Sequence, residues 1–307
     1  MLEFCVTTAI EYKVTCLRGN HCVIYGIFIS HVVVGVLDTL SAIVKCKKSV
    51  RCFNTAYYLL NHPNPSVSRL PLATFTIIAF IALLGLRLVI NQYFHAYPHP
   101  LFYYGYYFSY FVPIVSLNLV AVFALVAEKA YRQVNHDLKT MCDEKHQSLF
   151  NHNRLRYLAM KHDRITDFVD EISSCYGLDI LLGMFDCFLQ FVLFLYLAIW
   201  TLLVEGLFNS YHNWFIPYMS SFVEIFTIMF KIVYLCYRCQ KTTYHGALTL
   251  SYLHRLSTRR DLCSKSLQQI SVFVMQHHSR TIEITALKLF TLNMGLLFKA
   301  SSIIVLL

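Results

Sequence analysis

The chain has 307 residues, of which 57% are hydrophobic and 14% are charged, and its mean hydropathy is +0.51. Soluble domains have about a quarter of their residues charged, so this composition excludes an ordinary soluble protein and indicates a polytopic membrane protein. The net charge of +9 does not indicate a nucleic-acid partner, because the basic residues lie in segments that flank apolar runs. We therefore expect an all-α bundle of helices in a lipid bilayer, with no nucleic acid bound.

Six apolar segments come close to the roughly 20 residues that a helix needs to cross hydrocarbon. In chain order these expected spans are 22–44, 72–90, 101–127, 178–204, 214–236 and 289–307. Two long polar segments, 128–177 and 237–283, separate the later spans, and apolar residues recur within them at three- and four-residue steps. This spacing predicts amphipathic helices over 155–172 and 266–278.

Lys and Arg are distributed unequally between the segments that connect the spans. The segments 45–70, 128–177 and 237–283 hold five, eight and seven of them, whereas 91–100 and 205–213 hold none. By the positive-inside rule the first three segments are cytoplasmic, which leaves the C-terminus outside. The N-terminus would then also be outside, although no signal peptide precedes the first span. We therefore expect that a first helix is missing, and that the complete form has seven helices and a cytoplasmic N-terminus.

Two stretches of the second half match a known family. In residues 158–182 a polar helix runs through Tyr176-Gly177-Leu178 into an apolar span. In residues 273–307 the run Leu289-Phe290-Thr291-Leu292-Asn293 opens the last span, after Gln276, Glu283 and Ala286. In these motifs the chain resembles an insect gustatory receptor, of the superfamily that also contains the insect odorant receptors. The resemblance implies seven-helix subunits that form homo- or hetero-tetramers, in which the final helices line a cation pore opened by small-molecule tastants.

The resemblance also implies roles for particular segments. The helices 155–172 and 266–278 would pack below the membrane as an anchor for subunit assembly; the alternative is a pair of helices on the lipid surface. The last span would line the pore, and its candidate lining residues are Ser301, Ser302, Ile304, Val305 and Leu306. Hydroxyl groups suit a wet path and apolar constrictions can gate by dewetting, but an ordinary packed helix is the alternative.

A dense aromatic set at the start of the third span predicts a tastant pocket. Its candidate lining residues are Tyr103, Tyr104, Tyr107 and Tyr110, with Trp214 and Tyr218 opposite them. Aromatic walls with a few hydroxyl groups suit apolar or weakly polar small molecules. The alternative is an aromatic belt at the membrane interface, which also places Tyr and Trp at this depth.

The chain departs from the family pattern at three places. Ser301-Ser302 stand where the family has Thr-Tyr, a closing Gln-Phe would fall after Leu307, and Lys288 replaces a glycine before Leu289-Phe290. Glycine adopts a positive φ without steric cost and lysine does not. These departures favour a non-conducting accessory or degenerate receptor subunit as a second hypothesis. A transporter is a third, disfavoured because the sequence has no detectable internal repeat.

Charged residues inside the spans are candidates for function, because burying a charge in a membrane is costly. They are Asp38, Arg87, Asp186, Glu224 and Lys231. We expect structural ion pairs there rather than a conducting role, and we expect Asp179, at the inner end of its span, to be solvated.

We expect no metal, no cofactor and no enzymatic activity. His277-His278 have no further ligand at helical spacing, and Cys236 and Cys239 form an isolated C-x-x-C pair. Catalytic and nucleotide-binding motifs are absent from the sequence. The sequence thus predicts a ligand-gated cation channel subunit of the gustatory type, multi-pass in the plasma membrane.

Overall fold

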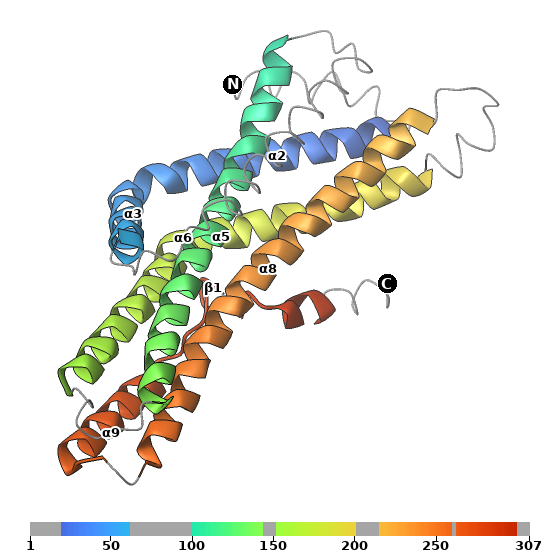
Figure 1. Cartoon of the computed structure of the whole chain (residues 1–307). Coiled ribbons are helices and arrows are strands. Elements are labelled where there is room, and N and C mark those ends of the chain that lie inside the picture. Colours follow the sequence, from blue (N-terminus) through green and yellow to red (C-terminus); the bar gives the residue numbers. More distant parts are fainter. Residues whose placement is uncertain (1–19, 62–99, 144–151, 201–214, 260–261, 300–307) are drawn as a thin grey trace.

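The computed structural model describes residues 20–61, 100–143, 152–200, 215–259 and 262–299 (Figure 1). The helices are α2 (Asn20–Val44), α3 (Cys46–Asn61), α5 (Pro100–Asp143), α6 (His152–Trp200), α8 (Phe215–Ser257) and α9 (Ser264–His278), and two short strands follow, β1 (Thr285–Ala286) and β2 (Phe290–Thr291). The predicted helical class is confirmed, with one small hairpin added. The expected span 72–90 lies outside the described residues.

Three helices are much longer than the hydrocarbon layer of a membrane. α5, α6 and α8 have 44, 49 and 43 residues, which at 1.5 Å per residue gives about 65–75 Å, against about 30 Å of hydrocarbon. The sequence predicts separate helical segments at 155–172 and 178–204, but α6 covers both, since Gly177 between them remains helical. Each long helix is therefore continuous and joins a polar half to an apolar half.

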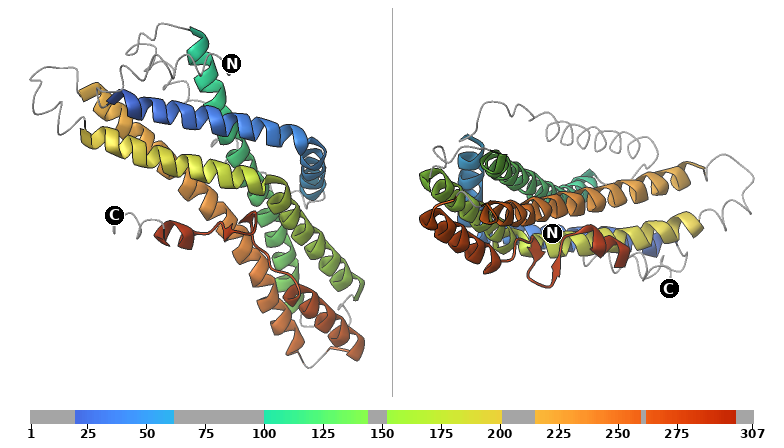
Figure 2. Two further views of the ribbon diagram at one scale, coloured as in Figure 1. Left: turned by 180° about the vertical axis from the view of Figure 1, so that it is seen from behind. Right: turned by 60° about the horizontal axis from the view of Figure 1, so that its bottom comes forward.

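The polar halves pack with α9 into one bundle, here called the polar bundle (Figure 1). It comprises 128–143 of α5, 152–177 of α6, 237–257 of α8, and α9. Its core side chains are almost fully buried and apolar: Tyr131, Leu138, Leu158, Phe168, Leu253 and Phe273. The views of Figure 2 also place α9 alongside the polar ends of α6 and α8. The apolar faces of the two expected amphipathic helices are thus covered by protein.

Beyond the polar bundle the long helices continue as apolar arms. Large apolar side chains are exposed along α6 and α8: Phe185, Phe188, Ile199, Phe222, Phe226 and Phe230. The stretches Pro113–Asp143 and Asn153–Tyr196 are long enough to cross a membrane and contain windows of suitable apolar composition. Soluble monomers rarely expose apolar surface of this extent, whereas a bilayer covers it.

Helix α3 lies in the segment 45–70, for which the sequence predicts only a polar connector. α2 ends before Lys45, and α3 turns sharply away from it (Figure 1). The buried residues Cys52, Ala56 and Leu59 follow one another at four- and three-residue steps, the spacing of one helix face. The helical period was present in the sequence, but the preceding cluster of basic residues obscured it.

The last expected span, 289–307, begins differently from the prediction. Phe290 and Thr291 pair with the strand before them, and a helix begins only at residue 294 and is described to residue 299. Hydropathy marks an apolar run but does not separate a short strand from a helix. The terminal helix therefore begins five residues later than the sequence predicts.

Candidate functional site

The predicted pore and pocket residues fall at the limits of the described structure. Ser301, Ser302, Ile304, Val305, Leu306 and Trp214 lie outside the described residues. Tyr103, Tyr104, Tyr107 and Tyr110 belong to α5 and Tyr218 to α8, but their side chains lie outside the description. The segment 279–299 leads directly into the predicted pore residues, and its attachment to the long helices forms the candidate site.

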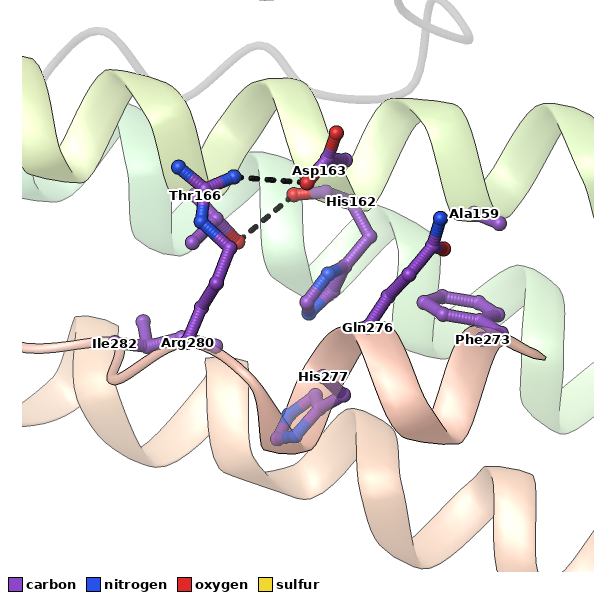
Figure 3. A pocket seen from close by; sticks show the side chains of 9 residues that line it. All are labelled: Ala159, His162, Asp163, Thr166, Phe273, Gln276, His277, Arg280 and Ile282. Atoms are coloured by element: carbon purple, nitrogen blue, oxygen red, sulfur yellow. Dashed lines mark hydrogen bonds and ion pairs between the residues drawn. The ribbon is translucent and has the colours of Figure 1, made fainter. Parts of the chain in front are cut away.

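Arg280 fixes the chain where it leaves α9. Its guanidinium donates hydrogen bonds to Asp163 at 2.8 Å, Asp167 at 2.6 Å and Asp170 at 2.9 Å, all on α6. Figure 3 shows Arg280 reaching across from the end of α9 to Asp163. Hydrogen bonding to Asp167 raises the pKa of Arg280, with a smaller effect from Asp163. Such charge-assisted hydrogen bonds are strong, but solvent screens these pairs because they are partly exposed. Their contribution to stability therefore comes from the three-carboxylate network as a whole rather than from any one pair.

A hairpin turn follows Arg280. Thr285 pairs with Thr291 and Ala286 with Phe290 in the antiparallel hairpin β1–β2. The turn residues Leu287 and Lys288 have φ of 51° and 62°, as a type I′ turn requires at both central positions. Lys288 therefore adopts the left-handed conformation that the family's glycine would adopt without cost.

Gly177 lets the hairpin approach α6 closely. A Cβ atom at Gly177 would lie 2.9 Å from the backbone nitrogen of Leu287, so a side chain there would force the turn away. One turn earlier on α6, the hydroxyl of Ser173 accepts a hydrogen bond from the backbone N–H of Thr285 at 3.1 Å. The Tyr-Gly-Leu motif of the sequence thus places a glycine where the polar bundle meets the turn.

Helix α8 holds the start of the terminal helix. Asn293 caps this helix, because its Oδ1 accepts a hydrogen bond from the N–H of Leu296 at 3.0 Å. Gln240 of α8 accepts a hydrogen bond from the N–H of Met294, also at 3.0 Å. A cavity of about 340 Å³ lies beside this contact, lined by Gln240, Thr243, Glu283, Ile284, Thr291, Leu292, Asn293 and Gly295. A displacement of α8 would therefore act directly on the first residues of the terminal helix.

Two histidines meet beneath Arg280. The ring centroids of His162 on α6 and His277 on α9 are 5.3 Å apart, and Nε2 of His277 lies 3.1 Å from the carbonyl oxygen of Gly246 on α8. They line a cavity of about 10 Å³ (Figure 3), room for one water molecule. Burial lowers the pKa of His162 to about 3, so its ring is neutral at pH 7.

This histidine pair packs where α6, α8 and α9 meet. In the described part of the chain, no group of three or more His, Cys, Asp or Glu side chains is placed to hold a metal ion. Sequence spacing along α9 could not reveal His162, which lies on another helix.

The acidic residues expected inside the spans are buried, and Lys231 is half-buried. Lys45 pairs with Asp179, whose Oδ1 also accepts a hydrogen bond from the hydroxyl of Ser41 at 2.8 Å. Asp179 is 1% exposed, so the prediction that it is solvated is wrong. Its partner Lys45 lies in the segment 45–70, which was predicted to be a connector. The other acidic residues of this kind are also buried: Asp38, Asp186 and Glu224. Arg87 lies outside the described residues.

These features define a class of protein. Its long helices form a bundle with their polar halves and membrane-spanning arms with their apolar halves, and they bind the start of a terminal helix where the two halves meet. The model of the 7tm chemosensory receptor family matches residues 4–306, so the chain belongs to this family. It is therefore a membrane protein, and the family predicted from the sequence motifs is confirmed at the level of the chemoreceptor superfamily.

A solved structure with a similar fold is the insect olfactory receptor OR5 from Machilis hrabei, determined in complex with eugenol. The two chains are 15% identical with a TM-score of 0.50, and the match covers 86% of this chain and 67% of that one. At this identity the likeness shows the fold alone. The comparison with curated proteins gives no match.

Proposed function

We propose that the chain is a subunit of a ligand-gated cation channel that responds to small-molecule tastants at the plasma membrane. The observation that carries the proposal is the attachment of the terminal segment: α6 holds it through Arg280 and Gly177, and α8 holds it through Gln240. The choice of tastants rather than odorants rests on the sequence motifs at 158–182 and 273–307.

In this proposal the polar bundle is cytoplasmic and joins subunits in a homo- or hetero-tetramer. The terminal helices then line the pore, with Ser301, Ser302, Ile304, Val305 and Leu306 as the candidate lining residues. Small molecules would bind at the outer ends of α5 and α8, among Tyr103, Tyr104, Tyr107, Tyr110, Trp214 and Tyr218. An olfactory receptor of the same fold has been solved with the small molecule eugenol, which supports a small-molecule ligand here.

Helix α8 offers a direct route from pocket to pore. It runs as one helix from Phe215 to Ser257, so its outer end would border the proposed pocket while Gln240 bonds the start of the terminal helix. Ligand binding that favours one position of α8 would bias the terminal helix by the difference in affinity between the two positions. Gln240 is the residue through which this coupling would pass.

The test is expression in a heterologous cell, alone and with co-receptors, with cation current recorded during a panel of tastants. Cysteine substitutions from residue 300 to residue 307 are then treated with a charged thiol reagent. In an active channel, a scan that never alters the current rejects the pore assignment. Gln240→Ala should lower the maximal response without loss of surface protein, whereas Asn54→Ala, at an exposed position of α3 outside the polar bundle, should leave it unchanged.

A non-conducting accessory subunit is the second candidate function. It is favoured by Lys288, whose φ of 62° places lysine in a conformation suited to glycine, and by Ser301-Ser302 in the expected pore segment. Surface delivery without current, together with altered ligand response of a conducting partner subunit, would support this candidate over the first.

A further inference from the structure

Two thiols face each other where α3 meets α6. Cys52 is 0% exposed and Cys175 is 5% exposed, and both belong to one cluster of buried core residues. Ser49 lies one helical turn before Cys52, and its Oγ is 3.7 Å from Sγ of Cys175. One face of α3 therefore presents a thiol and a hydroxyl to the same sulfur atom.

Contacts on both sides of the thiols fix the register of the two helices. α2 and α3 run antiparallel to α6, because Lys45 pairs with Asp179 while Arg51, farther along, lies 3.7 Å from Glu171. Farther still, Arg164 donates a hydrogen bond to the hydroxyl of Tyr58 at 2.8 Å. The packing of α3 against α6 therefore holds the two cysteines on facing sides of these helices.

The environments of the two sulfurs give them different reactivity. The hydrogen bond from Cys52 lowers the pKa of Cys175, and the Ser49 hydroxyl and the Lys45 charge act in the same direction. The same hydrogen bond, together with burial, raises the pKa of Cys52. The thiolate is the reactive form of cysteine. With the Ser49 hydroxyl also 3.7 Å from its sulfur, Cys175 would be the nucleophile of the pair, and Cys52 the thiol that resolves its oxidised form.

We propose that Cys52 and Cys175 form an oxidation site at which a hydroperoxide links α3 to α6 through a disulfide. The Cys175 thiolate attacks the peroxide, so that an S–O bond forms, the O–O bond breaks and, with hydrogen peroxide, one water leaves after protonation. The sulfur of Cys52 then attacks the sulfenic acid; the S–S bond forms, the S–O bond breaks, and the Cys52 proton leaves with the hydroxide as a second water. Two thiols are oxidised and one peroxide is reduced.

The link would join the α2–α3 hairpin to α6 beside the buried Lys45–Asp179 pair. Thiol reductants would reverse it by exchange, as is usual for intracellular disulfides. This site is independent of which ligand the receptor binds and of whether the chain conducts ions.

The experiment uses the purified full chain in detergent micelles, treated with hydrogen peroxide and then alkylated, digested and analysed by mass spectrometry. The expected result is a linked peptide pair containing Cys52 and Cys175, lighter than the two thiol peptides by two hydrogens and lost after reduction. Cys142→Ser, which removes a half-buried thiol elsewhere, should leave the yield of the link unchanged.

The order of the two steps is tested with single variants. With a dimedone-type probe, Cys52→Ser should increase the trapped sulfenic acid at Cys175 several-fold, because the resolving thiol is gone. Cys175→Ser should abolish both the link and the trapped species. The proposal is overturned if the wild-type protein is oxidised at the exposed Cys46 and Cys263 while Cys52 and Cys175 remain free thiols. This outcome is measured on the wild-type protein, so it does not depend on whether the variants fold.

Discussion

Replacing Lys288 by glycine measures the strain stored in the hairpin turn. Lys288 has φ of 62°, and the left-handed conformation costs a residue with a Cβ about 1–2 kcal/mol. Glycine in turn loses about 0.5–1 kcal/mol more conformational entropy on folding. The balance makes the Lys288→Gly hairpin more stable by about 0.5–1 kcal/mol, which lowers the population of its open form by about two- to fivefold.

Amide hydrogen exchange reports this opening directly. The N–H groups of Leu289 and Leu292 donate to the carbonyls of Ala286 and Ile284, both at 2.9 Å, and they exchange when the hairpin opens. Exchange at both amides should slow by the same two- to fivefold factor in Lys288→Gly. Lys288→Ala removes the charge but keeps Cβ, so its exchange should match the wild type. Equal rates in the glycine and alanine variants would refute the strain argument.

Three further predictions concern the polar contacts. Arg280→Ala should speed amide exchange in the linker after α9, because three carboxylates on α6 lose their common donor; the cost should stay near 1 kcal/mol, since the pairs are partly exposed. Lys45→Met should destabilise the protein by about 3–5 kcal/mol, because it leaves the Asp179 carboxylate buried without its cation. The double variant Lys45→Met/Asp179→Asn should recover most of the resulting decrease in melting temperature. The neutral form of His162, with its pKa lowered to about 3, supports a pH prediction. Below the unfolded pKa of about 6.5, His162 binds a proton in the unfolded state but not in the folded state. The free energy of unfolding should therefore decrease as the pH is lowered from about 6.5 toward 3, by up to about 1.4 kcal/mol per pH unit. His162→Phe should flatten the melting temperature between pH 7 and 5, and the exposed His278→Gln should not.

The class of fold and the family could be predicted from the sequence, but the site was predicted only in part. The motif around Phe290 and Asn293 lies in the segment that α6 and α8 hold, and the departure at Lys288 marked a position that adopts a positive φ. The same motif was assigned to a helix, because the five residues 289–293 do not by themselves indicate a partner strand. The predicted pore and pocket side chains remain predictions.

The sequence by itself determined the features that follow from local composition and spacing. These are the apolar spans, the amphipathic periods within 155–172 and 266–278, and the unequal distribution of basic residues; each depends on neighbours within a few turns of a helix. Only the tertiary structure decided which polar groups meet. Asp179 finds its cation in Lys45, His162 meets His277, and the thiols of two helices become a pair. Such contacts depend on the register in which whole helix faces pack, and that register is a property of the assembled fold.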